Sequence, residues 1–212
     1  MELTIRNEVP TDHRAVEALT KQAFWNVHAP GCDEHYLAHM LRKHDDFIPE
    51  LDFVLIADGA LIGNIMYTKA RLIDCEGREK AILTFGPLSV LPAYQRRGYG
   101  KRLVEHSFVR AAELGYDAVV IFGNPANYVG LGFKSCKKYG VSLDGDIFPT
   151  ALLVKELKPG SLGGRTWRYK ESEAYHIDAE AAAKFDEGFE ALQKKETPSQ
   201  EEFYILSRSR IQ

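Results

Sequence analysis

The sequence of 212 residues lacks the hallmarks of several protein classes. It has only three cysteines, Cys32, Cys75 and Cys136, which lie far apart and in no CxxC pair. A disulfide framework is therefore not expected, and a reducing compartment is favoured. The sequence contains no run of about 18 apolar residues that could cross a membrane, and the opening MELTIRNEVP has no apolar stretch typical of a secretory leader. We expect a cytoplasmic protein with no membrane partner.

The chain also lacks an excess of positive charge. Its 27 Lys and Arg residues against 30 Asp and Glu residues give a net charge of −3. This balance disfavours general binding of nucleic acid. With 45% hydrophobic and 27% charged residues, the composition is that of an ordinary globular protein. An anionic ligand would have to be held by a local cluster of basic side chains.

Motifs of several enzyme classes are missing as well. The sequence has no GxxxxGK[ST] phosphate loop, no HExxH metal motif and no GxSxG nucleophile motif. Its most metal-like cluster consists of Cys32, His35, His39 and His44. His35 and His39 would share one helix face, but a further ligand would have to come from elsewhere. We interpret the cluster as a polar helix face and expect no metal.

Strand-like and helix-like segments alternate through the first two thirds of the chain. Strands are predicted at residues 3–6, 53–57, 61–67, 71–74, 81–90, 118–122, near 141 and at 151–156. Helices are predicted after a start signal at residues 10–12, from residue 33, at 100–114 and at 125–131. Asp58-Gly59 is typical of a two-residue hairpin turn, so the middle strands should form an antiparallel meander. The strand–helix–strand order around residues 100–114 predicts a parallel pair. The fold class is therefore a mixed α/β sheet.

A Pro- and Gly-containing stretch at residues 159–164 marks a boundary. We predict a domain at residues 1–160 and a C-terminal extension at residues 161–212, with a strand at 167–169, a helix around 179–194 and a last helix from about Ser199. The extension is too rich in apolar residues for a solvated linker. It should pack on the core or on a second subunit, and the latter would make the protein a homodimer.

The segment Gln95-Arg96-Arg97-Gly98-Tyr99-Gly100 lies between a predicted strand and a predicted helix. Gly98 and Gly100 let backbone amides approach a ligand closely, and a helix N-terminus adds partial positive charge. Between residues 90 and 110, a single acidic residue, Glu105, faces five basic ones: Arg96, Arg97, Lys101, Arg102 and Arg110. This local excess predicts a ligand that carries a polyphosphate, and a nucleotide is one alternative.

Two motifs at this point resemble those of the GNAT acetyltransferase superfamily. Gln95, Gly98 and Gly100 match the family's Q/R-x-x-G-x-G/A motif. Downstream, the stretch from Gly123 to Phe133 is similar to the G-x-P-x-x-Y-x3-GF signature of one branch of small bacterial members. The resemblance covers about residues 1–170. It implies a central sheet that splays after Leu88, with helices on both faces, and acetyl-CoA as co-substrate.

The resemblance also implies roles for individual residues. Backbone groups at Leu88, Ser89 and Val90 would pair with the pantetheine arm, and Asn124, or Asn127 near it, would contact the same arm. Tyr128 falls at the family's general-acid position, from which a phenol would protonate the departing thiolate. The pyrophosphate would be held by the loop and the helix start, that is Gln95, Arg96, Arg97, Gly98, Tyr99, Gly100 and Lys101.

The activity that this resemblance implies is transfer of an acetyl group to a primary amine of a small molecule or a peptide. The general base is not evident, because residues 82–88 contain no carboxylate. Glu50 and Asp52 are candidates, but surface solvation is the preferred explanation for both. The missing carboxylate motivates one alternative, a non-catalytic module that binds acyl-CoA.

Overall fold

The computed structural model describes residues 2–212 and contains one mixed sheet. Its strands are β1 (Leu3–Asn7), β2 (Phe53–Ala57), β3 (Ala60–Asp74), β4 (Glu79–Val90), β5 (Ala118–Phe122), β6 (Lys134–Ser135), β7 (Val141–Ser142), β8 (Leu152–Glu156) and β9 (Trp167–Lys170). The helices are α1 (His13–Phe24), α2 (Glu34–Leu41), α3 (Tyr99–Glu113), α4 (Pro125–Tyr128), α5 (Ala179–Asp186) and α6 (Pro198–Arg208). The order across the sheet is β1-β2-β3-β4-β5-β8-β6, and β9 pairs with β3 and β7. In residues 2–212, no helix has the length and apolarity needed to span a bilayer.

The first four strands of the sheet are antiparallel, as the sequence predicts. β2 and β3 are joined by Asp58 and Gly59, whose φ angles of +47° and +81° are both left-handed. Two consecutive left-handed residues give a turn whose twist matches that of the flanking strands. The long strand β3 then pairs with β4 from Gly63↔Val90 to Ile73↔Glu79.

The parallel pair that the sequence predicts is formed by β4 and β5, and it is very short. The two strands are in register only at Leu83↔Val119. Beyond this pair, β4 continues to Val90, whereas β5 follows β8 through Phe122↔Leu152. We call the region beyond Leu83 and Val119, where the two strands are no longer paired, the splay.

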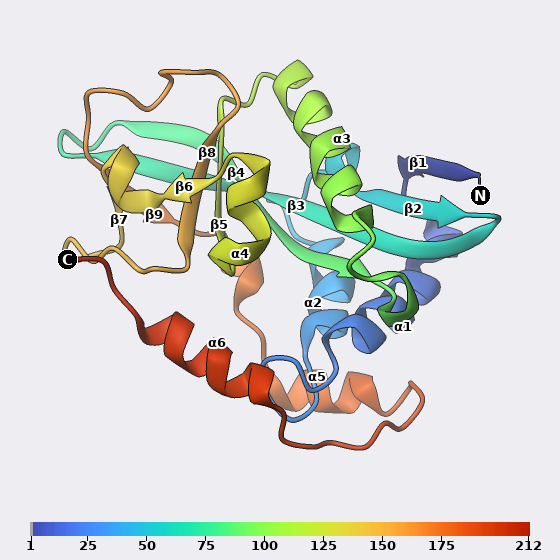
Figure 1. Cartoon of the computed structure of the whole chain (residues 1–212). Helices are drawn as coiled ribbons and strands as arrows, with labels where there is room; N and C mark the ends of the chain where they lie inside the picture. The colour runs from blue at the N-terminus through green and yellow to red at the C-terminus, as the bar shows by residue number, and fades with distance from the viewer. Residues whose placement is uncertain (1) are drawn as a thin grey trace.

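Helices cover both faces of the sheet, as expected (Figure 1). α3 packs with its buried Leu103 and Val104 against the larger core cluster, which includes Tyr67 of β3. On the opposite face, Leu41 of α2 packs against Met66, the neighbour of Tyr67 in β3. Because successive strand residues point to opposite faces, β3 contributes to the core on both sides.

The C-terminal segment differs from the prediction in one element. The predicted helix at 179–194 ends at Asp186, because the chain beyond Gly188 runs irregularly along α1 and exchanges helical hydrogen bonds for side-chain ones. The Lys21 ammonium donates to the Glu190 carbonyl at 2.9 Å, and the Trp25 indole donates to the Gln193 carbonyl at 3.0 Å. The final helix is present as α6, and the predicted strand is present as β9, which lies beside β3.

Ion pairs hold α5 against α1 and α2. The Asp186 carboxylate lies 2.5 Å from Lys21 Nζ and 3.0 Å from His35 Nε2. The Lys21 side chain is 4% exposed and that of His35 is fully buried. Burial lowers the pKa of His35, which favours its neutral form, so Lys21 carries the cationic half of the pair.

Replacing Asp186 should destabilise the fold, because it leaves the buried Lys21 ammonium without a counter-charge. Breaking a largely buried pair from one side costs about 3 kcal/mol, and we expect Asp186→Ala to lower the free energy of unfolding by about that much. The neighbouring Glu187 is exposed, and Glu187→Ala should change stability by less than about 0.5 kcal/mol. Urea unfolding measures both; equal stabilities would contradict the role given to Asp186.

Candidate functional site

The β4 side of the splay presents backbone rather than side chains. Leu88 and Val90 pack into the cluster beneath α3. Ser89 is fully buried on the other face, and its hydroxyl donates to Thr20 Oγ1 of α1 at 3.0 Å. On the side of β3, these residues are in register with Ile65, Asn64 and Gly63. A segment with engaged side chains and an edge free of β5 is suited to pair with an extended ligand through its main chain.

The loop after β4 folds back onto the strand end. The Gln95 side chain donates from Nε2 to the Val90 carbonyl at 3.0 Å, which fixes the start of the loop. Arg96 and Gly98 both have left-handed φ angles, +59° and +84°. A Cβ built at Gly98 meets no atom within 4 Å, so the space above this residue is open. The side chains of Arg96 and Arg97 are exposed beside it.

The N-terminus of α3 begins directly at this loop. Gly98 is the N-cap, and no side chain caps the helix there, so an anion can approach the positive end of the helix dipole. Lys101 is exposed on the same turn. Gly100 faces β4, where an added Cβ would make ordinary contacts of 3.8 Å with Val90 Cγ2 and 3.9 Å with Leu88 Cδ2. Close packing therefore does not require glycine at position 100, whereas the φ angle does at position 98.

Tyr99 is the predicted site residue whose side chain points elsewhere. It is 7% exposed and belongs to the core beneath α3, with its ring 6.1 Å from that of Tyr94. Its side chain thus meets the loop at Tyr94, from the core side. No sequence pattern indicates this, because a tyrosine at the first position of a helix suits both a ligand contact and a core contact.

Tyr128 comes from the other side of the splay, at the end of α4. Its ring lies 5.8 Å from that of Phe85 in β4 and 5.7 Å from that of Phe133. Burial raises the pKa of Tyr128 to about 12, and within residues 2–212 its hydroxyl has no hydrogen-bond partner. The phenol is therefore protonated near neutral pH and has a proton available for a ligand.

Asn124 and Gly123 determine where the Tyr128 ring lies. The Asn124 side chain caps α4, since its Oδ1 accepts from the Ala126 amide at 3.0 Å. A Cβ at Gly123 would lie 2.5 Å from Cε2 of the Tyr128 ring. Glycine at position 123 thus leaves the space in which the ring packs.

The two carboxylates proposed as general bases lie outside the splay. Asp52 is buried, accepts from Asn64 Nδ2 at 3.0 Å and faces Glu8; burial, with Glu8 next, raises its pKa to about 9. Glu50 is exposed, and its charge acts on Tyr116, which precedes β5. That end of β5 is opposite to the end at which the strands diverge.

Residues of the C-terminal extension reach the splay, which the sequence did not predict. The Tyr175 hydroxyl donates to the Gly86 carbonyl of β4 at 3.2 Å. The ring of Tyr169 in β9 lies 6.1 Å from that of Phe122, the last residue of β5. The only feature of the sequence that indicated these contacts was the apolar and aromatic content of residues 161–212.

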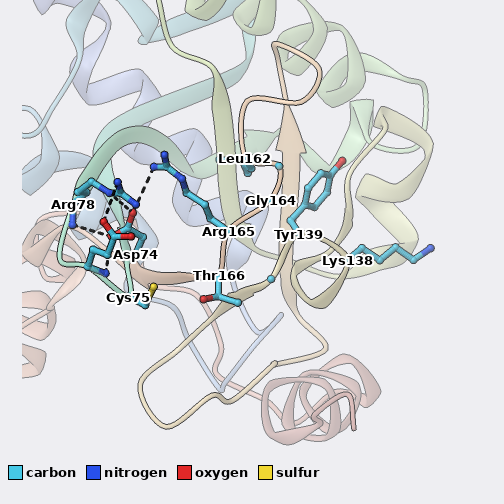
Figure 2. Close-up of a pocket in the computed structure, with 12 residues that line it drawn as sticks. Asp74, Cys75, Arg78, Lys138, Tyr139, Leu162, Gly164, Arg165 and Thr166 are labelled. Carbon is cyan, nitrogen blue, oxygen red and sulfur yellow. Dashed lines mark hydrogen bonds and ion pairs between the residues drawn. The ribbon is translucent and has the colours of Figure 1, made fainter.

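A cavity of about 650 Å³ lies elsewhere, between the β3–β4 turn and the loop before β9. Figure 2 shows Arg78 and Arg165 directed at Asp74, whose carboxylate accepts from them at 2.7 and 3.5 Å. None of the predicted site residues lines this cavity. Its two arginines are engaged by Asp74, so we regard it as a structural feature of the turn.

Comparison with known proteins places the chain in a family context. The family model described as "Acetyltransferase (GNAT) family" matches residues 17–133, more than half of the chain. YhbS of Escherichia coli strain K12, named as an uncharacterized N-acetyltransferase, is 29% identical over 165 residues, which are 77% of this chain and 93% of YhbS. YjhQ of the same strain, also named as an uncharacterized N-acetyltransferase, is 28% identical over 100 residues, 47% of this chain and 55% of YjhQ.

Solved structures agree with this context. The structure of Escherichia coli YhbS in complex with CoA superposes with a TM-score of 0.69 at 28% identity, covering 82% of this chain and 91% of that one. A GNAT family acetyltransferase from Brucella melitensis in complex with acetyl-CoA gives a TM-score of 0.64 at 23% identity, covering 82% of this chain and 99% of that one. The second likeness is one of fold alone.

The packing of Tyr128 against Gly123 leads to a prediction on stability. Gly123→Ala forces the Tyr128 ring out of its position, and overpacking of this kind costs about 1–3 kcal/mol. Gly130 is the matched control: it lies two residues beyond Tyr128 and has open space around an added Cβ. Gly130→Ala should be close to neutral. If thermal and urea unfolding found both variants as stable as the wild type, the placement of the ring would be wrong.

Proposed function

The chain belongs to the acetyltransferase (GNAT) family, and from this membership we propose that it transfers the acetyl group of acetyl-CoA to a primary amine of a small molecule or a peptide. As a member it is an acetyltransferase with acetyl-CoA as its co-substrate. The amine acceptor and the residue roles below are the proposal. The observation that carries it is the convergence of the open β4 edge, the α3 N-terminus and Tyr128 on one region, the splay.

In this proposal, acetyl-CoA lies along β4. The pantetheine arm pairs with the backbone of Leu88, Ser89 and Val90, for which the missing β5 partner leaves room. The diphosphate lies over Gly98, where the uncapped amides of α3 and the exposed basic side chains supply positive charge. The residues assigned to it are Gln95, Arg96, Arg97, Gly98, Tyr99 (through its backbone), Gly100 and Lys101. Asn124 contacts the arm from the β5 side.

The reaction proceeds by direct attack. The amine nitrogen attacks the thioester carbonyl carbon, a C–N bond forms and the C–S bond breaks. The departing CoA sulfur takes a proton from the Tyr128 hydroxyl, which its surroundings keep protonated. The packing of the ring between Phe85 and Phe133 supports this role because it fixes the hydroxyl beside β4.

The alternative of a non-catalytic module that binds acyl-CoA is not favoured. The relatives that match most of this chain are named as N-acetyltransferases. The motif tyrosine is present at the splay with its hydroxyl uncommitted, and a module that only bound the cofactor would not require it.

We also propose that residues 161–212 serve the acetyltransferase domain of residues 1–160 as an extension that shapes the acceptor side. Its strand β9 lies in the same sheet, and Asp186 pairs with Lys21 of α1. A reducing compartment such as the cytoplasm is supported by the three free cysteines. Homodimer formation through α6 is supported by the exposure of Tyr204 and Ile205.

Tyr128→Phe tests the acid. Removing the hydroxyl should lower kcat by about 100-fold while leaving the Kd for acetyl-CoA unchanged, because the proton is needed only as the C–S bond breaks. Tyr139→Phe, beside the remote cavity, should keep full activity. Release of the CoA thiol with an amine panel and calorimetry with acetyl-CoA measure the two effects. Unchanged turnover in Tyr128→Phe would remove this residue from the mechanism.

Gly98→Ala tests the diphosphate site against a control with the same strain. Gly98 and Gly77 have φ angles of +84° and +79°, and neither has an atom within 4 Å of an added Cβ. Both alanine variants should lose about 1–2 kcal/mol of stability. Only Gly98→Ala places a methyl group where the diphosphate approaches, so only its Kd for acetyl-CoA should rise, by about tenfold or more. An equal Kd for the two variants in calorimetry would contradict the site.

A further inference from the structure

The segment from Tyr169 to Tyr175 crosses the splay and touches both of the strands that diverge there. Tyr175 donates to the carbonyl of Gly86, three residues beyond the last paired residue of β4, Leu83. Tyr169 contacts Phe122, three residues beyond the last paired residue of β5, Val119. The two contacts therefore lie at the same depth of the splay, and the residues between them are held close to it.

Glu171 is the acidic residue that this segment carries to the splay. Its Oε1 lies 3.5 Å from the Tyr169 hydroxyl. Burial first, and then the negative charge of Glu171, raise the pKa of Tyr169; the same two effects act on Tyr175. The carboxylate is thus near both phenols that touch the diverging strands. Residue 171 as a whole retains solvent-exposed surface, although its carboxylate is desolvated enough for its pKa to be raised, so a ligand can reach it.

Tyr128 and the segment that carries Glu171 contact β4 from opposite faces of the sheet. Tyr128 packs with the core beneath α3, against Phe85. Tyr175, four residues after Glu171, packs with the cluster beneath α2 and donates to the carbonyl of Gly86, the residue that follows Phe85 in β4. The base must reach the incoming nitrogen and the acid must reach the departing sulfur, two different atoms on one tetrahedral carbon, and groups on either side of β4 can do so.

The other carboxylates considered as bases do not meet this requirement. Residues 82–88 of β4 have none, and Asp52 and Glu50 lie outside the splay. Glu173, two residues farther along, is 81% exposed and is paired at 2.7 Å with His176 of its own turn.

We propose that Glu171 is the general base of the reaction, the residue that takes a proton from the ammonium group of the acceptor. The inference rests on the proposed function and names the group that function lacks. The ammonium gives its first proton to the Glu171 carboxylate, and the free amine attacks the acetyl carbon. As the C–S bond breaks, the sulfur takes the Tyr128 proton. The nitrogen releases its second proton, which restores Tyr128, and Glu171 returns the first to solvent.

The surroundings of Glu171 suit a base. Partial burial raises its pKa from the ordinary value, while the hydrogen bond from the Tyr169 hydroxyl and the nearby His176 act in the opposite direction. The titratable groups that face it are Tyr169, Tyr175 and His176. A carboxylate with a raised pKa accepts a proton from an ammonium more readily than an ordinary one. Tyr169 and Tyr175 are positioning residues in this arrangement.

Glu171→Gln tests the proposal, with Glu173→Gln as the matched control. The probes are alanine amide, an α-amine, and Nα-acetyl-lysine amide, an ε-amine. At pH 7, kcat/KM for the amine should fall by about 30- to 100-fold in Glu171→Gln and stay unchanged in Glu173→Gln. The Kd for acetyl-CoA should be the same in both variants. A Kd that rises only in Glu171→Gln would mean that Glu171 supports cofactor binding, which would overturn the proposal.

The pH profile separates a base from a structural residue. An α-amine loses its proton near pH 8 and an ε-amine near pH 10, and a free amine no longer needs the base. The deficit of Glu171→Gln should therefore shrink above about pH 8 for alanine amide, but persist there for the lysine derivative. The same deficit at every pH with both probes would contradict the role.

A measurement that needs no acceptor tests the location. In a Cys75→Ser background, which removes the exposed native thiol, Glu171→Cys and Glu173→Cys are each labelled with a maleimide. Saturating acetyl-CoA should slow labelling at position 171 and leave position 173 unchanged. Equal rates at position 171 with and without acetyl-CoA would overturn the assignment of Glu171. If the wild-type protein did not bind acetyl-CoA at all, the proposed function itself would be overturned.

Discussion

The site depends on the single backbone pairing between β4 and β5, at Leu83↔Val119. Unpaired strand edges normally attract another strand, and in this protein such an edge lies inside the sheet rather than at its rim. β4 is held on its other side by β3 as far as Val90, so it stays extended without β5. β5 is held by β8. Both strands that border the splay are therefore held in place. A ligand that pairs with β4 does not have to order this strand first.

The groups of the candidate site follow from this divergence. The end of β4 leads directly into the loop that Gln95 ties to Val90 and then into α3, whose uncapped N-terminus points back to the strand end. The end of β5 leads into α4, which brings Tyr128 to Phe85. A binding edge, an anion site and an acid thus arise from the two chain segments that leave the same pair of strands.

The C-terminal extension, which is far from β4 and β5 in the sequence, covers the splay. β9 is fixed beside β3, and α5 is fixed to α1 and α2 through Asp186. The segment between these two anchors has little freedom and lies across the splay, where Tyr175 meets Gly86. A buried ion pair is weak evidence for net stability. The pair of Asp186 with Lys21 nevertheless forms only when α5 lies against α1, so it fixes the position of α5. In this account, the extension brings Glu171 to the acceptor side.

The sequence was sufficient for the parts of the fold that local patterns control. The hairpin at Asp58-Gly59, α3 and the parallel pair were predicted from turn chemistry, periodicity and chain order, and the structure confirms them. The helix predicted to Lys194 was wrong because contacts with α1, more than 160 positions away, replace its hydrogen bonds. Likewise, Tyr175 and Gly86 are 89 positions apart, so no local pattern could reveal the contact that brings Glu171 to the splay.

Amide hydrogen exchange with and without acetyl-CoA shows whether the free edge of β4 is the binding surface. Acetyl-CoA should slow exchange at residues 84–90 of β4 and at residues 96–101 of the loop and helix start. Unchanged exchange there, with slowing confined to residues 74–78 and 163–166 around the remote cavity, would contradict this assignment of the binding surface.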